Sequence, residues 1–182
     1  YLLLDSYPDY RNIIDKYSCN GERIVVFGLA NEQITGEAVT KAITPMAFII
    51  LENEIRETAK ETFEYFKKQG VAIKVISGDN PLTASKVAIR AGIDDATHYI
   101  DATTLKTDKD IADAVQKYTV FGRVIPEQKK KIIEAFKMAG NVVAMTGDGV
   151  NDVLALKCAD CSVAMASGSE AASNAAQVVL LD

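Results

Sequence analysis

Two segments of the sequence place a hydroxyl side chain, a glycine and a carboxylate directly after an apolar run. Residues 77–79 read Ser-Gly-Asp after the apolar pair 75–76, and residues 146–149 read Thr-Gly-Asp-Gly after the apolar stretch 142–145. Residues 151–152 then add Asn-Asp. Paired carboxylates beside a phosphate site are typical of Mg²⁺, which prefers oxygen ligands and keeps several waters. Glycines in such a loop let the backbone approach the metal and the phosphate closely.

Two other phosphate-binding motifs are excluded, and one structural alternative stays open. Residues 147–152 begin like the G-x-G-x-x-G of a dinucleotide-binding turn but end in Asp, which would repel a pyrophosphate unless a cation intervened. The chain has no G-x-x-x-x-G-K-[ST], so a P-loop is excluded. Either Gly-Asp pair alone could be an ordinary strand-to-helix turn. Two of them favour a shared ligand site, because the carboxyl ends of parallel strands form the ligand crevice.

Lys129 lies on the apolar face of a predicted helix. Its helical neighbours at i+3, i+4 and i+7 are all apolar: Ile132, Ile133 and Phe136. Lys130 instead shares its stripe with Glu134 and is expected to face solvent. A lysine on an apolar face either extends its ammonium group to solvent or reaches a buried anion. The residues alone leave both interpretations open; if the anion is a phosphate next to Asp148, Lys129 balances its charge.

Helix-like and strand-like patterns alternate along most of the chain. Strands are predicted over residues 24–29, 47–51, 71–76, 98–100, 118–124, 142–145, 161–165 and 178–181. Helices are predicted over residues 56–69, 81–91, 108–117, 126–140, 153–159 and 170–176. Asn80 followed by Pro81 is a helix start signature, and Gly92 is a stop signal. The alternation predicts an α/β fold whose parallel sheet is covered by helices on both faces.

Composition excludes several classes of protein. The net charge is −5 with no strongly basic stretch, which argues against a nucleic-acid partner. No apolar run approaches the roughly 20 residues of a membrane helix, and the opening Tyr-Leu-Leu-Leu-Asp lacks the basic region of a signal peptide. Three cysteines fit a reducing compartment better than a disulfide framework. Cys158 and Cys161 form a C-x-x-C but are expected to be buried and inert.

The motifs taken together resemble those of the P-type cation-transporting ATPases, which belong to the haloacid dehalogenase superfamily. The resemblance is carried by Ser-Gly-Asp-Asn-Pro at 77–81, Arg-Val-x-Pro at 123–126 with Lys129, and Thr-Gly-Asp-Gly-Val-Asn-Asp at 146–152. It extends from about Arg23 to the last residue. It implies a three-layer, Rossmann-like parallel sheet of the haloacid dehalogenase type.

The resemblance also implies a domain organisation and a membrane setting. Residues 1–42 match the C-terminal end of a nucleotide-binding domain, and residues 43–182 match the later part of a phosphorylation domain. In the family, the phosphorylated aspartate lies in an Asp-Lys-Thr-Gly-Thr motif, which this chain lacks. We therefore expect a soluble, monomeric fragment that is inactive alone. Its nucleophile and membrane helices would lie outside it, and the whole protein would place it at the cytoplasmic face of the cell membrane.

The family's residue roles carry over position by position. Its members use ATP and Mg²⁺ to form an aspartyl-phosphate, whose hydrolysis drives transport of a cation. Ser77, where the family usually has Thr, would hold the phosphoryl group, and Lys129 would neutralise its charge. Asp148 and Asp152 would bind Mg²⁺, and Asn151 with Asp152 would order the site. The positions expected to bind the nucleotide are Arg23, Arg56, Gly78, Asp79 and Arg123.

Some positions depart from the family pattern, and other functions remain alternatives. Asn53 stands where many members have Asp, residues 153–154 read Val-Leu instead of Ala-Pro, and Cys158 stands where an acidic residue is common. A soluble phosphatase of the same superfamily would also carry Gly-Asp-x-x-Asn-Asp and a distant lysine. A module that binds nucleotide or Mg²⁺ without catalysis is the third alternative. The transported ion is not identified, since selectivity lies in membrane helices outside this chain.

Overall fold

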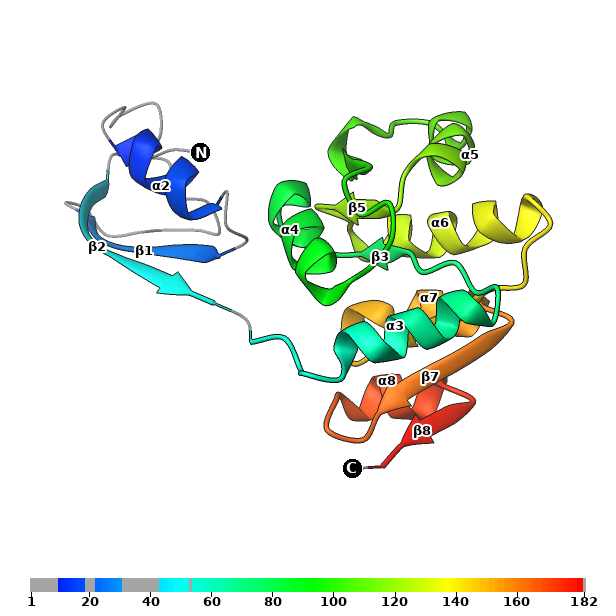
Figure 1. Ribbon diagram of the computed structural model, residues 1–182. Coiled ribbons are helices and arrows are strands. Elements are labelled where there is room, and N and C mark those ends of the chain that lie inside the picture. The colour runs from blue at the N-terminus through cyan, green and yellow to red at the C-terminus, as the bar shows by residue number, and fades with distance from the viewer. Residues whose placement is uncertain (1–9, 19–21, 31–42, 53, 182) are drawn as a thin grey trace.

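A small N-terminal unit and a larger α/β unit are joined by an extended segment after β2 (Figure 1). The computed structural model describes residues 10–18, 22–30, 43–52 and 54–181. The N-terminal unit holds α2 (Arg11–Ser18), β1 (Arg23–Ala30) and β2 (Ile43–Leu51). The larger unit begins with α3 (Ala59–Lys68), β3 (Val75–Ile76), α4 (Pro81–Ala91), β4 (Tyr99–Asp101), the 3₁₀ turn η2 (Ala102–Thr104), α5 (Asp108–Lys117) and β5 (Val120–Gly122). It continues with α6 (Pro126–Met138), β6 (Ala144–Gly147), the 3₁₀ turn η3 (Val150–Asp152), α7 (Val153–Cys158), β7 (Cys161–Met165), α8 (Glu170–Ala175) and β8 (Val178–Leu180).

The N-terminal unit is an antiparallel hairpin against which α2 packs. β1 and β2 pair in a register that sets Val25 opposite Ile49. The ring centroids of Tyr10 and Phe48 lie 5.3 Å apart. This pairing joins residues on both sides of the predicted domain boundary between residues 42 and 43. The division of the chain into two domains stays a prediction.

The strands of the larger unit form two three-stranded sheets, in which every pairing is parallel. Their orders are β3-β5-β4 and β6-β7-β8. Helices alternate with these strands, so the predicted α/β fold with parallel strands is confirmed. Within the described residues, β3 pairs only with β5 and β6 only with β7. Each sheet therefore has two edge strands, β3 and β4 in one and β6 and β8 in the other, whose second sides have no ladder partner in this part of the chain.

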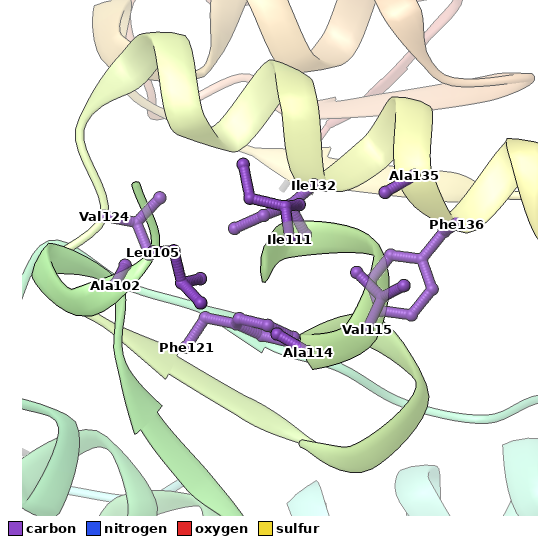
Figure 2. Packing of buried hydrophobic residues seen from close by; sticks show 10 residues of the cluster. All are labelled: Ala102, Leu105, Ile111, Ala114, Val115, Phe121, Val124, Ile132, Ala135 and Phe136. Atoms are coloured by element: carbon purple, nitrogen blue, oxygen red, sulfur yellow. The ribbon is translucent and has the colours of Figure 1, made fainter. Parts of the chain in front are cut away.

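Helix α6 lies between two hydrophobic clusters. Ile132 and Phe136 pack into a cluster with Phe121 of β5 and Ile111 of α5 (Figure 2). Ile133, the next residue of α6, packs instead with Met145, Ala155, Leu156, Ala164 and Ala172. Two partly buried side chains, Ile76 at the end of β3 and Val143 before β6, pack against both clusters. The two sheets are therefore neighbours around α6, although no backbone ladder joins β3 to β6 among the described residues.

Several element boundaries predicted from sequence agree with the structure because local side-chain chemistry sets them. The Asn80 side chain accepts a hydrogen bond from Leu82 N at 2.9 Å, and Pro81 is the first residue of α4. Gly92 ends that helix in the left-handed region, where glycine avoids the steric cost of a Cβ. Helix α5 covers the predicted 108–117, capped by Thr107 and Asp110.

The predicted strands are longer than the paired ones. The apolar run 71–76 forms a ladder only at Val75–Ile76, and the predicted strand 118–124 pairs only over Val120–Gly122. The prediction over 71–74 is wrong because a strand requires a hydrogen-bonded neighbour, which apolar composition alone does not supply. Val153 and Leu154 stand where the family commonly has Ala-Pro. The helix still forms there, since α7 begins at Val153.

The cysteine pair is less buried than composition suggested. Cys158 is half-buried, and burial raises the pKa of its thiol. The expectation of burial is wrong for Cys161, which is exposed because it points away from the core at the start of β7, where Ser162 points inward. Cys19 lies outside the described residues. In the described part of the chain, no helix is both long enough and apolar enough to cross a membrane.

Replacing Ile132 by Ala is expected to lower the free energy of unfolding by about 2–5 kcal/mol, because removal of core methyl groups leaves a cavity. Ile132 is fully buried between α5 and β5. The matched control is Ile89→Ala on the exposed side of α4, expected to cost about 1 kcal/mol or less. Chemical unfolding of both variants measures the difference. An equal decrease in the free energy of unfolding in the Ile132→Ala and Ile89→Ala variants would contradict the observed packing around α6.

Candidate functional site

We use the name rim for the ends of strands β3, β4, β5 and β6, the loops after them and Lys129 of α6. These are residues 77–79, 101, 122–124, 129 and 146–152. Ser77 N donates to Phe121 O at 2.9 Å, and Val124 N donates to Ser77 O at 3.0 Å, so the ends of β3 and β5 are joined. Lys129 of α6 contacts Asp152, in the turn after β6, and links this group to the second sheet. The two Gly-Asp segments are therefore connected through the end of β5 and the first turn of α6.

Lys129 faces inward, as its helical stripe predicts. Its Nζ donates to Asp152 Oδ1 at 2.6 Å, and the two side chains are only 13% and 10% exposed. The second carboxylate oxygen of Asp152 accepts from Gly149 N at 3.1 Å. Lys130 points outward, near Glu134 at 3.5 Å. Of the two possibilities for Lys129, the structure shows contact with a buried anion, and that anion is Asp152.

Asp148 is held through its backbone while its side chain is exposed. Ser169 N donates to Asp148 O at 2.7 Å. Gly168 lies so close that a Cβ on it would stand 2.6 Å from the same oxygen. No hydrogen bond or ion pair engages the Asp148 carboxylate among the residues that the structure describes. The loop before α8 thus supports Asp148 from behind and leaves its carboxylate accessible.

The donor set suits a Mg²⁺ ion whose coordination is completed by a substrate. No group of three or more His, Cys, Asp or Glu side chains that could hold a metal occurs within the described ranges. Mg²⁺ is commonly bound by one or two carboxylates together with phosphate oxygens and waters. The accessible Asp148 fits this pattern. Both oxygens of Asp152 already accept hydrogen bonds, so a metal at Asp152 would share them with Lys129 and Gly149.

The Ser-Gly-Asp loop after β3 is folded onto β5. Asp79 N donates to Ser77 Oγ at 3.1 Å, which orients the hydroxyl. Arg123 N donates to Asp79 O at 2.7 Å. The first residues of α4 press against β5 at Gly122, where a Cβ would lie 2.3 Å from Pro81 Cα. A glycine at position 122 is therefore required for the loop carrying Ser77 to lie at the rim.

Arg123 has a φ of 54°, uncommon for a residue with a side chain. Its Nη1 donates to Asp101 Oδ2 at 2.6 Å. The Thr103 hydroxyl and backbone N–H bond the other carboxylate oxygen, and the pKa of Asp101 is lowered first by that hydroxyl and also by Arg123. Sequence reasoning missed Asp101. The sequence does contain a pattern that could have indicated it. Asp101 follows a predicted strand and precedes Thr103 by two residues, a spacing at which an aspartate side chain commonly accepts hydrogen bonds from the turn.

Of the remaining predicted site residues, Asn151 lies at the rim, whereas Arg56 does not. Asn151 lies in η3 and is exposed. Arg56 precedes α3 and lines a pocket of about 800 Å³ together with Glu54, Lys60 and Arg90, none of which belongs to the rim. Arg23 opens β1, but its side chain lies outside what the structure describes, as does Asn53. Their roles stay predictions.

Comparison with known sequences identifies relatives along the whole chain. Over 184 residues it is 42% identical to a probable cation-transporting ATPase, exp7, of Streptococcus pneumoniae, covering 100% of this chain and 23% of that protein. It is 42% identical over 182 residues to the calcium-transporting ATPase CtpE of Mycobacterium bovis, with the same coverage. The chain thus spans about a quarter of the length of these curated relatives.

Solved structures with the same fold include catalytic parts of related pumps. The catalytic domain of a CPx-ATPase, CopB-B, matches with a TM-score of 0.55 and 28% identity over 78% of this chain and 45% of that one. A zinc-transporting PIB-type ATPase matches with a TM-score of 0.60 and 21% identity, over 93% of this chain and 22% of that one, and supports the fold alone. The haloacid dehalogenase-like hydrolase family matches residues 16–160. The chain therefore belongs to the haloacid dehalogenase-like hydrolases, and its relatives over its full length are cation-transporting P-type ATPases.

Proposed function

We propose that this chain is the part of a membrane cation pump that stabilises the transferred phosphoryl group and its Mg²⁺ while an aspartate elsewhere in the protein is phosphorylated by ATP. The observation that carries the proposal is the buried Lys129–Asp152 pair, which sits beside the accessible carboxylate of Asp148. A fixed cation and a metal-binding carboxylate at strand ends are suited to stabilising charge on a phosphoryl group.

The nucleophile requires a place at the same rim. Within the described residues, β3 and β6 are edge strands, each paired on one side only, and Ile76 of β3 and Val143 before β6 pack against the same two hydrophobic clusters. In the proposed pump, a parallel strand from another part of the protein pairs with both and ends in the phosphorylated aspartate. The absence of an Asp-Lys-Thr-Gly-Thr motif from this sequence and the greater length of the relatives support this arrangement.

Each rim residue then has a defined task. A lysine ammonium has three N–H donors, so Lys129 can keep its bond to Asp152 and also donate to a phosphoryl oxygen. The Ser77 hydroxyl donates to a second phosphoryl oxygen. Asp148 would hold Mg²⁺, which when bound would neutralise phosphoryl charge and orient the transferring group. Asp152 keeps Lys129 in position, and Asn151 orders the adjacent turn.

The nucleotide is held by the first sheet. Gly78, Asp79 and Arg123 occupy the ends of β3 and β5, joined by the hydrogen bond from Arg123 N to Asp79 O. Arg56 and Arg23 bind it from the linker and the N-terminal unit. The pump acts at the cytoplasmic face of the membrane, anchored by helices outside this chain, and the chain itself is a soluble monomer. Its cation is unassigned, because relatives named for calcium, magnesium and potassium transport all match this chain.

Lys129→Ala in the full-length protein is expected to lower ATP hydrolysis by about 10²–10³-fold, because a preorganised charge at the phosphoryl group is lost. Lys130→Ala, one residue away and facing solvent, is the matched control and should retain activity. Thermal unfolding of each variant separates loss of catalysis from loss of folding, since removal of Lys129 leaves Asp152 unpaired. Near-normal hydrolysis by a folded Lys129→Ala protein would contradict the assigned role.

The isolated chain is expected to form no aspartyl-phosphate, because it lacks the nucleophile. Incubation with γ-labelled ATP and Mg²⁺, followed by acid precipitation and hydroxylamine treatment, detects any such product. The full-length protein should give an acid-stable, hydroxylamine-sensitive phosphoprotein under the same conditions. A hydroxylamine-sensitive phosphoprotein formed by the isolated chain would show that the nucleophile lies within it.

Gly168→Ala is expected to raise the Mg²⁺ concentration needed for half-maximal activity of the full-length protein by about tenfold. The added methyl group would meet the Asp148 backbone oxygen at 2.6 Å and displace the loop that carries the metal ligand. Ser167→Ala, at the exposed neighbouring position, is the control. An unchanged Mg²⁺ dependence in a folded Gly168→Ala protein would show that Asp148 is not positioned by this contact.

A further inference from the structure

The backbone at Arg123 is held in an uncommon conformation by its neighbours. Its φ of 54° lies in the left-handed region, which side-chain-bearing residues seldom adopt. The hydrogen bonds from Arg123 N to Asp79 O and from Val124 N to Ser77 O lock this conformation onto the loop after β3. Such conformations persist where the surrounding structure fixes them, and they cluster at functional sites. The side chain at this position therefore leaves the backbone in a direction set by the Ser77–Asp79 loop.

Asp101 fixes the other end of this side chain. Asp101 closes β4 and stands opposite Gly122 in the parallel register, next to Arg123. Its Oδ2 accepts from Arg123 Nη1 at 2.6 Å, while its Oδ1 accepts from the Thr103 hydroxyl at 2.6 Å and from Thr103 N at 3.0 Å. Both carboxylate oxygens are thus committed, so the carboxylate cannot rotate away from the guanidinium without breaking bonds to Thr103.

The pair differs from the other ion pairs on the surface. The Arg123 and Asp101 side chains are 31% and 25% exposed, whereas in the Lys131–Asp108 pair, also at 2.6 Å, they are 51% and 83% exposed. Partly buried charges are less screened by salt and hold a more defined geometry than exposed ones. A guanidinium is planar and carries five N–H donors in a fixed fork, so a bond at Nη1 sets the direction of the others.

We propose that Asp101 is a positioning residue for nucleotide binding, which holds the Arg123 guanidinium in the orientation in which it contacts an anionic nucleotide at the rim. This inference rests on the proposed function, in which Arg123 contacts the nucleotide. Asp101 itself does not touch the nucleotide, since its carboxylate would repel phosphate. The proposal distinguishes Asp101 from a purely structural link between β4 and β5, which would affect folding but not nucleotide affinity.

A double-mutant cycle in the full-length protein tests the proposal. The variants are Asp101→Asn, Arg123→Ala and their combination, with Asp108→Asn as the matched control that breaks the exposed pair with Lys131. Dissociation constants for a non-hydrolysable ATP analogue with Mg²⁺, KM and kcat for ATP, and thermal unfolding temperatures are measured for each.

Asp101→Asn is expected to weaken analogue binding and raise KM by about tenfold with little change in kcat, in line with loss of a charge-assisted hydrogen bond. In the Arg123→Ala background the same substitution should have no further effect, because residues that act through one another are not additive. Thr103→Val, which removes the hydroxyl that anchors Asp101, should give a smaller change in the same direction. Asp108→Asn should match the unmodified protein.

Each alternative outcome has a distinct meaning. Unchanged analogue affinity in a folded Asp101→Asn protein, or an equal loss with and without Arg123, overturns the positioning role while leaving the nucleotide role of Arg123 intact. Unchanged affinity in Arg123→Ala overturns that nucleotide role as well, and with it this inference. If Asp101→Asn fails to fold, the Thr103→Val variant provides the test instead. Unchanged affinity of that variant for the ATP analogue overturns the positioning role.

Discussion

The buried ion pair between Lys129 and Asp152 is the interaction on which the rest of the site depends. Removing two charges from water is costly, and the cost is offset only when geometry is good and further hydrogen bonds satisfy the remaining atoms. Here the 2.6 Å contact is supplemented by the hydrogen bond from Gly149 N to the second carboxylate oxygen. The pair therefore fixes the turn after β6 against the first turn of α6, and so places Asp148 relative to the first sheet.

Close backbone approaches and one shared helix complete this arrangement. A Cβ at Gly147 would lie 2.6 Å from the Asp152 side chain, and Gly168 makes an equally close approach to Asp148. In helix α6, Ile132 packs into one hydrophobic cluster and Ile133 packs into the other. The same helix that carries Lys129 thus holds the two sheets together, which explains how residues far apart in sequence reach one rim without a strand ladder joining the sheets.

Local patterns in the sequence predicted much of this fold, whereas long-range pairing had to be observed. The inward position of Lys129 follows from helical periodicity, and the start of α4 follows from Asn80 and Pro81, since both depend on neighbours within one turn. The separation of the strands into two sheets, the shortness of β3 and the ion pair between Asp101 and Arg123 depend on contacts between distant segments. Composition carries no information about which strand edge meets which partner.

A structure of the full-length protein with Mg²⁺ and a phosphate analogue tests the central claim most directly. The account predicts a parallel strand that pairs with both β3 and β6 and ends in an aspartate carboxylate. That carboxylate should lie next to the analogue, within reach of Lys129 Nζ and beside a Mg²⁺ ion held by Asp148. Direct pairing of β3 with β6, or an inserted strand with no carboxylate at the rim, would contradict the account.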